Sequence, residues 1–210
     1  MSGKIMIKDR GCIVGITGNS GCGQSTAASF VAEHCAGVCS LDTIGHRLLN
    51  KRYVQRDLAD GFSNRSMQAM DESEIRSELR SIVFDDPQKM AILNSILHPR
   101  MVRWASISAE LMKYGKGIKV LEGALIYELK IDRYPDYMIV IEDTAERCAE
   151  RIAARDDIPV EYALKRWDRQ FPIDAKVERA DYVVHNTRDM DYMKQQILTI
   201  FGDIENRLLI

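Results

Sequence analysis

The feature that most constrains the fold is a glycine-punctuated turn near the start of the chain. The apolar, β-branched run at residues 13–16 predicts a buried strand, and the Ser-Thr-Ala-Ala-Ser-Phe-Val-Ala run that starts at Ser25 predicts a helix. Between them, Gly18, Gly23 and Ser25 match the spacing of the pattern G-x-x-x-x-G-K-[ST]. Such glycines let several backbone N–H groups point at one anion, and the helix adds the positive end of its dipole. The sequence therefore predicts a phosphate-binding loop (P-loop).

One position of this loop departs from the pattern, because Gln24 stands where the pattern has lysine. In the phosphate-binding interpretation Ser25 holds Mg²⁺, and residue 24 carries a cation to the β- and γ-phosphates. Gln24 offers only a neutral amide. The alternative interpretation is a glycine-rich turn that binds nothing, and whether the loop supports catalysis stays open at this point.

The bulk composition is ordinary for a globular protein of 210 residues, with 46% hydrophobic and 29% charged residues. A net charge of −2 gives no polybasic signal for nucleic acid or for an anionic membrane. The five cysteines lack C-x-x-C spacing, which indicates reduced thiols rather than a zinc site. We find no secretory leader pattern and no segment with the ~20 apolar residues of a membrane helix, so we expect a cytoplasmic protein.

Strand and helix patterns alternate along the chain. After the loop, short buried strands are expected at residues 37–41, 118–121, 137–141 and 181–185, and residues 44–114 look helical. This alternation predicts an α/β fold with a five-stranded, parallel, doubly wound sheet. We expect a single domain with three parts. They are a core at about 11–50, 115–145 and 176–210, a helical insertion at about 51–114, and a helical segment at about 146–175.

Four further motifs follow the loop in order. Ser40-Leu41-Asp42 closes the second predicted strand, and Leu93-Asn94-Ser95-Ile96-Leu97-His98-Pro99 lies in the helical region. Arg155-Asp156 ends a helix that also carries Arg147 and Arg151 at four-residue intervals, and residues 180–186 read Ala-Asp-Tyr-Val-Val-His-Asn. In order and spacing these motifs resemble the dephospho-CoA kinase family, over about residues 13–200. That family has Asp-x-Asp where this chain has Ser40 and Asp42.

The resemblance implies a P-loop kinase fold of the nucleoside-monophosphate-kinase type, in which the insertion at about 51–114 binds the acceptor and residues at about 146–175 form a lid. It implies a transfer of phosphate from ATP, with Mg²⁺, to dephospho-CoA. It implies that Asp42 orients or deprotonates the acceptor hydroxyl and that Arg155 of the lid acts on the transferring phosphate. The acceptor is expected to contact Arg76, His98 and Leu125. The residues expected to bind ATP are Asn19, Ser20, Gly21, Cys22, Gly23, Gln24, Ser25, Thr26, Arg151 and Asn186, with Ser25 also the metal ligand.

Each of these residues also has a plainer interpretation. Asp42 is compatible with a helix N-cap, Arg76 with a solvated helix arginine, and His98 with a core histidine bonded to backbone. Glu122, at the end of the third strand, is either a second metal-site carboxylate or a buried structural one. Two rival functions stay open. One is a non-catalytic homologue that binds nucleotide or CoA, which Gln24 favours, and the other is a kinase of the same fold with another small-molecule acceptor.

Overall fold

The structure is a computed structural model that describes residues 11–83 and 86–209. The N-terminal residues on which we based the absence of a leader lie outside the described residues. The chain divides into two compact units, and each is described here by itself. The first comprises residues 11–40 and 108–209 of the described chain, and the second is Leu41–Ile107. The sequence placed the insertion at about 51–114.

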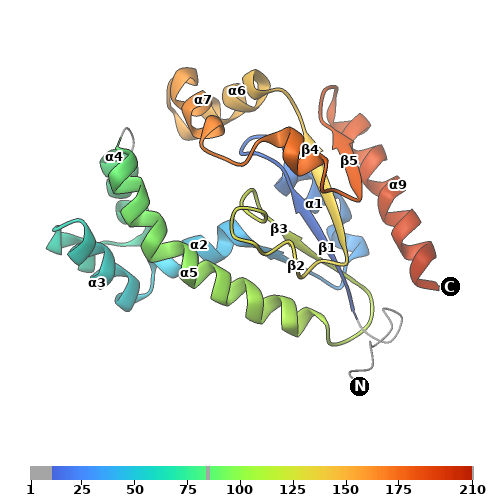
Figure 1. The fold of residues 1–210 in the computed structure, drawn as a ribbon, viewed down its shortest axis with the longest axis horizontal. Coiled ribbons are helices and arrows are strands. Elements are labelled where there is room, and N and C mark those ends of the chain that lie inside the picture. Colours follow the sequence, from blue (N-terminus) through green and yellow to red (C-terminus); the bar gives the residue numbers. More distant parts are fainter. Residues whose placement is uncertain (1–10, 84–85, 210) are drawn as a thin grey trace. The chain divides into compact units, whose positions relative to one another are not determined.

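The first unit is built on a five-stranded sheet whose paired strands all run parallel, in the order β2-β3-β1-β4-β5 (Figure 1). This confirms the predicted fold class. The predicted strand boundaries differ from the observed ones by one residue at most. The strands are β1 (Cys12–Thr17), β2 (Gly37–Ser40), β3 (Ile118–Glu122), β4 (Tyr137–Glu142) and β5 (Tyr182–His185).

Strand β1 occupies the centre of the sheet, and every one of its residues is buried. It pairs with β3 on one side and with β4 on the other. Gly15 leaves room for a neighbour, because a Cβ there would lie 2.4 Å from Sδ of Met138. Since β1 is covered on both faces, its C-terminal end delivers the loop at residues 18–25 into the middle of the sheet edge, where ligands bind in open α/β sheets.

Helices α1 (Gln24–Val31) and α9 (Met190–Leu209) cover one face of this sheet (Figure 1). Their apolar sides join alternate strand residues, such as Val14 and Ile16, in the main core. The predicted helix over residues 25–36 is shorter in the structure. It gives way to a 3-10 turn, η2 (Ala32–His34), because the N–H of Ala36 bonds to the carbonyl of Ile118 and starts the sheet pairing.

The predicted lid contains α6 (Ala145–Asp156), α7 (Val160–Asp168) and the start of α8 (Ile173–Val177). Thr144 caps α6 as expected, since its side chain accepts a hydrogen bond from the N–H of Arg147. Helix α6 ends at Asp157, which adopts a left-handed conformation with φ of 52°. A small core holds α6 and α7 together, and its buried members are Ala149, Ile152 and Ala163.

The second unit is helical. Its elements are α2 (Leu41–Leu49), α3 (Arg52–Gly61), η3 (Arg65–Gln68), α4 (Glu72–Val83) and α5 (Pro87–Met112), the last of which continues into the first unit. A capping box begins α4. Asp71 accepts from the N–H of Glu74, and Glu74 accepts in return from the N–H of Asp71. Pro99 lies inside α5, where it removes one helical hydrogen bond.

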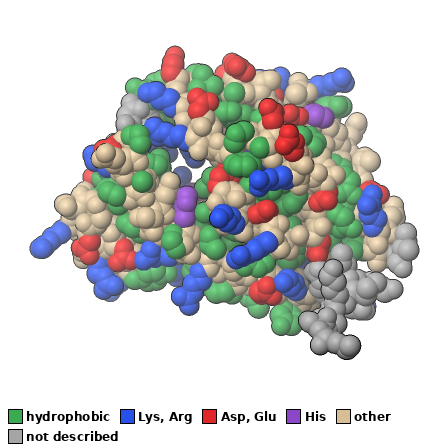
Figure 2. Space-filling model, viewed as in Figure 1, with side chains coloured by type: hydrophobic (Ala, Val, Ile, Leu, Met, Phe, Trp, Pro, Cys, Tyr) green, Lys and Arg blue, Asp and Glu red, His purple; other side chains and the backbone are tan. Residues whose placement is uncertain are grey.

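Acidic and basic side chains are interspersed over the face seen in Figure 2, in keeping with the net charge of −2. Within residues 11–83 and 86–209, none of the helices is both long enough and apolar enough to span a bilayer.

Candidate active site

The loop between β1 and α1 has the backbone that its glycines predict. Gly21 and Gly23 adopt left-handed conformations, with φ of 83° and 99°. A Cβ at Gly21 would lie 2.4 Å from the carbonyl oxygen of Cys148, so α6 packs directly on this residue. A Cβ at Gly18 would lie 2.4 Å from the carbonyl oxygen of Ile141. These glycines let the loop turn sharply between two neighbouring backbones.

Helix α1 begins at Gln24 without a side-chain cap, since its N-cap is Gly23. The N–H groups of its first turn therefore face the loop without a capping oxygen, which is the arrangement that binds anions. Two buried side-chain oxygens near this turn, Oδ1 of Asn19 and Oε1 of Gln24, have no hydrogen-bond partner within the described residues. Buried polar atoms of this kind are usually satisfied by a ligand or water.

Gln24 is itself mostly buried, with 7% of its surface exposed. The loop thus keeps its conformation with a neutral residue at the lysine position. What the substitution removes is a positive charge.

Ser25 and Glu122 form a pair at the edge of the sheet. The hydroxyl of Ser25 donates to Oε2 of Glu122 at 3.1 Å, and Glu122 is the buried last residue of β3. Hydroxyl and carboxylate oxygens are the ligands that Mg²⁺ prefers. The residues present therefore fit Mg²⁺. The sequence left Glu122 as either a metal-site carboxylate or a buried structural one, and a metal role stays a prediction.

Three side chains from distant segments hold the loop from outside. Nη1 of Arg151, on α6, donates to the carbonyl of Gly21 at 3.0 Å. Oε1 of Gln170 accepts from the N–H of Ser20 at 2.7 Å. Nδ2 of Asn186, just after β5, donates to the carbonyl of Cys22 at 2.9 Å. The structure thus brings Arg151 and Asn186, both expected to bind ATP, to the loop itself.

Behind the loop lies a pair of buried thiols. The thiol of Cys148 donates a hydrogen bond to the sulfur of Cys22, with 3.4 Å between the two Sγ atoms. This bond lowers the pKa of Cys22, and together with burial it raises the pKa of Cys148. Sequence spacing gave no hint of the pair, because 126 residues separate the two cysteines.

A second contact that sequence reasoning missed involves Lys176 of α8, which is fully buried. Its ammonium group bonds to the carbonyl of Ala124 and to Oε1 of Glu128, each at 2.8 Å. Burial lowers the pKa of Lys176, and the neighbouring Glu128 carboxylate opposes that shift. Glu128 also accepts from the N–H of Phe171 at 3.0 Å. Phe171 and α8 are therefore fastened to the segment that follows β3, and half-buried Leu125 belongs to that segment.

Arg155 is largely exposed and makes two bonds to the adjacent Asp156, of 2.9 and 3.1 Å. Arg166 of α7 bonds to the same carboxylate at 3.1 Å. A phosphate that recruits Arg155 has to compete with Asp156 for its guanidinium group.

The remaining predicted residues belong to the second unit. Asp42 is the exposed second residue of α2, two positions beyond the end of β2. Arg76 is exposed on α4, and His98 is half-buried on α5. All three lie on helices, as the helical reading of residues 44–114 led us to expect for the last two.

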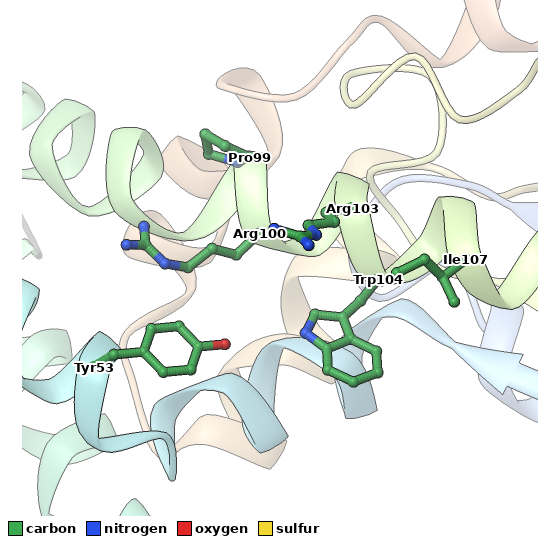
Figure 3. A pocket seen from close by; sticks show the side chains of 6 residues that line it. All are labelled: Tyr53, Pro99, Arg100, Arg103, Trp104 and Ile107. Atoms are coloured by element: carbon green, nitrogen blue, oxygen red, sulfur yellow. The ribbon is translucent and has the colours of Figure 1, made fainter.

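This unit also contains a pocket of about 780 Å³. Tyr53 of α3 and Trp104 of α5 point toward one another across it (Figure 3), and each exposes nearly half of its surface. The guanidinium group of Arg100 already has partners within the protein, since it pairs with Asp57 and lies over the Tyr53 ring. The lining residues are Tyr53, Pro99, Arg100, Arg103, Trp104 and Ile107. His98 and Arg76 are not among them.

A sequence model of the dephospho-CoA kinase family matches residues 12–191. The match covers the P-loop, the helical unit, the lid segment and β5. The chain belongs to the dephospho-CoA kinase family.

Individual relatives agree with this assignment. The chain is 32% identical to the dephospho-CoA kinase of Chlorobaculum tepidum over 198 residues, which cover 91% of this chain and 94% of the relative. It is 30% identical to the dephospho-CoA kinase of Aquifex aeolicus over 198 residues, with coverages of 91% and 96%. Among solved structures, the dephospho-CoA kinase from Campylobacter jejuni is 25% identical, with a TM-score of 0.60 and coverages of 92% and 97%. As a dephospho-CoA kinase family member, the chain is a P-loop kinase, and the phosphate donor of that family is ATP.

Proposed function

We propose that this protein transfers the γ-phosphate of ATP to the ribose 3′-hydroxyl of dephospho-CoA, which gives ADP and CoA. The observation that carries the proposal is the backbone of the loop. Gly21 and Gly23 keep the left-handed turns that aim N–H groups at an anion, although Gln24 has replaced lysine. Membership of the dephospho-CoA kinase family supports the acceptor.

On the donor side, we assign the phosphates to the loop amides of residues 19–26 and to Arg151. Ser25 and Glu122 would hold Mg²⁺, directly or through water. When bound, Mg²⁺ neutralises charge on the phosphate oxygens. Asn186 supports the loop through the carbonyl of Cys22, and its expected contact with ATP itself stays a prediction.

On the acceptor side, we assign Asp42 as the carboxylate that accepts the proton of the attacking hydroxyl. Its exposure at the start of α2 leaves it free to approach a substrate. The pocket between Tyr53 and Trp104 suits a ligand with a flat ring, and exposed Arg103 at its rim suits a phosphate. Arg76, His98 and Leu125 stay as proposed acceptor contacts outside this pocket.

The setting we propose is the cytoplasm. The five cysteines are odd in number and lack C-x-x-C spacing, which supports reduced thiols in a reducing compartment.

A second candidate function is nucleotide or CoA binding without efficient transfer. Gln24 favours it, because the loss of one preorganised donor at a transition state costs about 10²–10³ in rate. This candidate keeps the same ligands and removes the turnover.

The test is a coupled assay of ADP release with Mg·ATP and dephospho-CoA, run beside shikimate and adenosine as alternative acceptors. Of the three acceptors, we expect only dephospho-CoA to be phosphorylated. Asp42→Asn should lower kcat by about 10²-fold or more while the affinity for ATP changes little, because only the acceptor hydroxyl loses its proton acceptor. Glu33→Gln, on the exposed turn after α1, is the control and should leave turnover unchanged.

The arms separate the candidates. Turnover with shikimate or adenosine but not with dephospho-CoA would refute the acceptor. If calorimetry shows that ATP and dephospho-CoA bind but the coupled assay shows no turnover, the second candidate function, binding without efficient transfer, is favoured. An Asp42→Asn variant with full activity would refute the role of Asp42.

A further inference from the structure

A fully buried carboxylate follows β4 at the edge of the sheet. Asp143 is the residue after Glu142, and its side chain has no exposed surface. Its Oδ1 accepts from the N–H of Thr144 at 2.8 Å, and Nε of Arg147 lies 3.1 Å from the same oxygen. Its Oδ2 accepts from Nη2 of Arg151 at 2.6 Å. One carboxylate thus meets two guanidinium groups, which leaves this cluster with a net positive charge.

Arg151 carries that charge to the phosphate-binding loop. While Nη2 binds Asp143, Nη1 donates to the carbonyl of Gly21 at 3.0 Å. These two bonds leave most of the N–H donors of the guanidinium uncommitted. The side chain stays 37% exposed, so a ligand can approach the guanidinium group.

The other two arginines of α6 are directed elsewhere. Besides Asp143, Arg147 donates to the carbonyls of Asn186 and Arg188, each at 3.4 Å. Arg155 makes its two bonds to Asp156. The contact with Gly21 therefore distinguishes Arg151 as the α6 arginine best placed to act on the loop.

The loop itself has a charge deficit, since Gln24 supplies a neutral amide where the P-loop pattern has a cation. Three residues before it in the same loop, Gly21 is the point that Arg151 touches. Even from outside the loop, a cation at this distance raises the electrostatic potential at an anion that the loop amides bind. The buried carboxylate of Asp143 fixes its position before any ligand arrives.

We propose that Arg151, held in place by Asp143, supplies at the loop the positive charge that Gln24 lacks, so that Asp143 is a positioning residue for phosphate binding and transfer. This inference rests on the proposed function insofar as the anion is the triphosphate of ATP. Asp143 does not touch the substrate. It acts by keeping the guanidinium of Arg151 against the loop.

The first experiment compares Arg151→Gln in two backgrounds, the natural chain and Gln24→Lys. Dissociation constants for Mg·ATP come from calorimetry, and kcat/KM comes from the coupled assay. In the natural chain we expect Arg151→Gln to lower kcat/KM by about 10²-fold. In the Gln24→Lys background we expect a loss below about 10-fold, because lysine then fills the role that arginine had.

Arg166→Gln is the matched control, since it removes an exposed lid arginine that pairs with Asp156. It should have the same small effect in both backgrounds. Equal losses from Arg151→Gln in the two backgrounds would overturn the proposal, because the two positions would then act independently.

The second experiment tests Asp143. Asp143→Asn keeps an oxygen for the N–H of Thr144 and removes the charge that holds Arg151. We expect it to weaken Mg·ATP binding nearly as much as Arg151→Gln, and to add little when the two changes are combined. If Asp143 had a purely structural role, the losses of Mg·ATP affinity would add in the double variant, or Asp143→Asn would lower the melting temperature without weakening Mg·ATP binding. Either result would refute the positioning role.

Calorimetry separates this inference from the proposed function. If no variant turns over dephospho-CoA, the dependence of the ATP dissociation constant on residues 24, 143 and 151 still decides the inference. If Mg·ATP binds to no variant, both the inference and the proposed function are wrong.

Discussion

At position 21 the loop depends on the absence of a side chain. The residue has φ of 83°, and its missing Cβ would lie 2.4 Å from a backbone oxygen of α6, an atom that cannot move aside as a flexible side chain could. Gly21→Ala should therefore push α6 from the loop, cost about 2 kcal/mol of unfolding free energy and weaken Mg·ATP binding. Urea unfolding and calorimetry measure the two effects.

Gly37→Ala is the control for this change. Gly37 lies in β2, and a Cβ there would meet no atom within 4 Å. It should leave nucleotide binding unchanged. A Gly21→Ala variant that binds nucleotide as well as Gly37→Ala does would contradict the close packing of α6 on the loop.

Lys176 gives a second prediction for a single residue. Lys176→Met removes the buried cation and leaves Glu128 without its partner, so we expect a loss of about 3 kcal/mol in unfolding free energy. Glu128→Gln added to Lys176→Met should recover part of the loss, because the amide carries no charge and can still accept from Phe171. Denaturant titration of the three variants tests this. A double variant less stable than Lys176→Met would refute the account.

We expect the contribution of Tyr182 to the unfolding free energy to depend on pH. Burial and its hydrogen bond to Asp203, of 2.6 Å, raise the pKa of Tyr182 from 10.0 to about 12. Because the folded state holds this proton more tightly than the unfolded state, the contribution to stability is complete below about pH 9 and is lost as the pH rises from 10 toward 12. The difference in unfolding free energy between the natural chain and Tyr182→Phe should shrink over that range. A difference that stays constant to pH 12 would contradict the raised pKa.

At the scale of elements, α9 contains a glycine that its surroundings do not require. A Cβ at Gly202 would meet no atom within 4 Å. Since glycine is a poor helix former, Gly202→Ala should stabilise the protein by about 0.5–1 kcal/mol. Gly61→Ala, at the end of α3, should give no such gain, because its Cβ would lie 3.0 Å from Cδ1 of Ile96. Thermal unfolding compares the two, and equal shifts would show that local space does not decide the effect.

Elements were predictable where local pattern and tertiary pairing agree. The strands were found because their apolar runs are buried in the sheet. The helix after the loop was predicted too long, since the sequence does not show that Ala36 bonds to Ile118, which lies in a strand over 80 residues away. The helical region was read as one stretch, but the Asp71–Glu74 capping box that starts α4 needs only local chemistry and could have been found.

The residues of the candidate site were likewise predictable only where the local sequence pattern determines them. Gly18, Gly23 and Ser25 follow from spacing alone. Asp143 and Lys176 do not, because their roles depend on α6 and α8 approaching the loop and the segment after β3. The position of Asp143 just beyond a strand end was the available signal. It is the same signal that led us to Asp42.

For the whole molecule, nucleotide should act as a stabiliser. A ligand that binds only the folded state raises stability by about 2.7 kcal/mol at 100 times its dissociation constant. For a chain of this size, that corresponds to a rise of roughly 5–10 °C in melting temperature. We expect this shift with Mg·ATP and a smaller one when EDTA removes the metal. A melt that ATP does not move at any concentration would contradict a working loop.

The two thiols behind the loop tie this chain to the chemistry of its surroundings. Cys22 and Cys148 already touch, at 3.4 Å, and a covalent bond between sulfurs is about 2 Å long. Oxidation by dissolved oxygen, which removes one hydrogen from each thiol, would join them in a disulfide that tethers the nucleotide loop to α6 until a reductant cleaves it. A sample of the protein kept in air would then contain a reduced form without this tether and an oxidised form with it. The two forms would bind the same nucleotide with different affinities. Nucleotide affinity should therefore be measured with reductant in the buffer, so that only the reduced form is present.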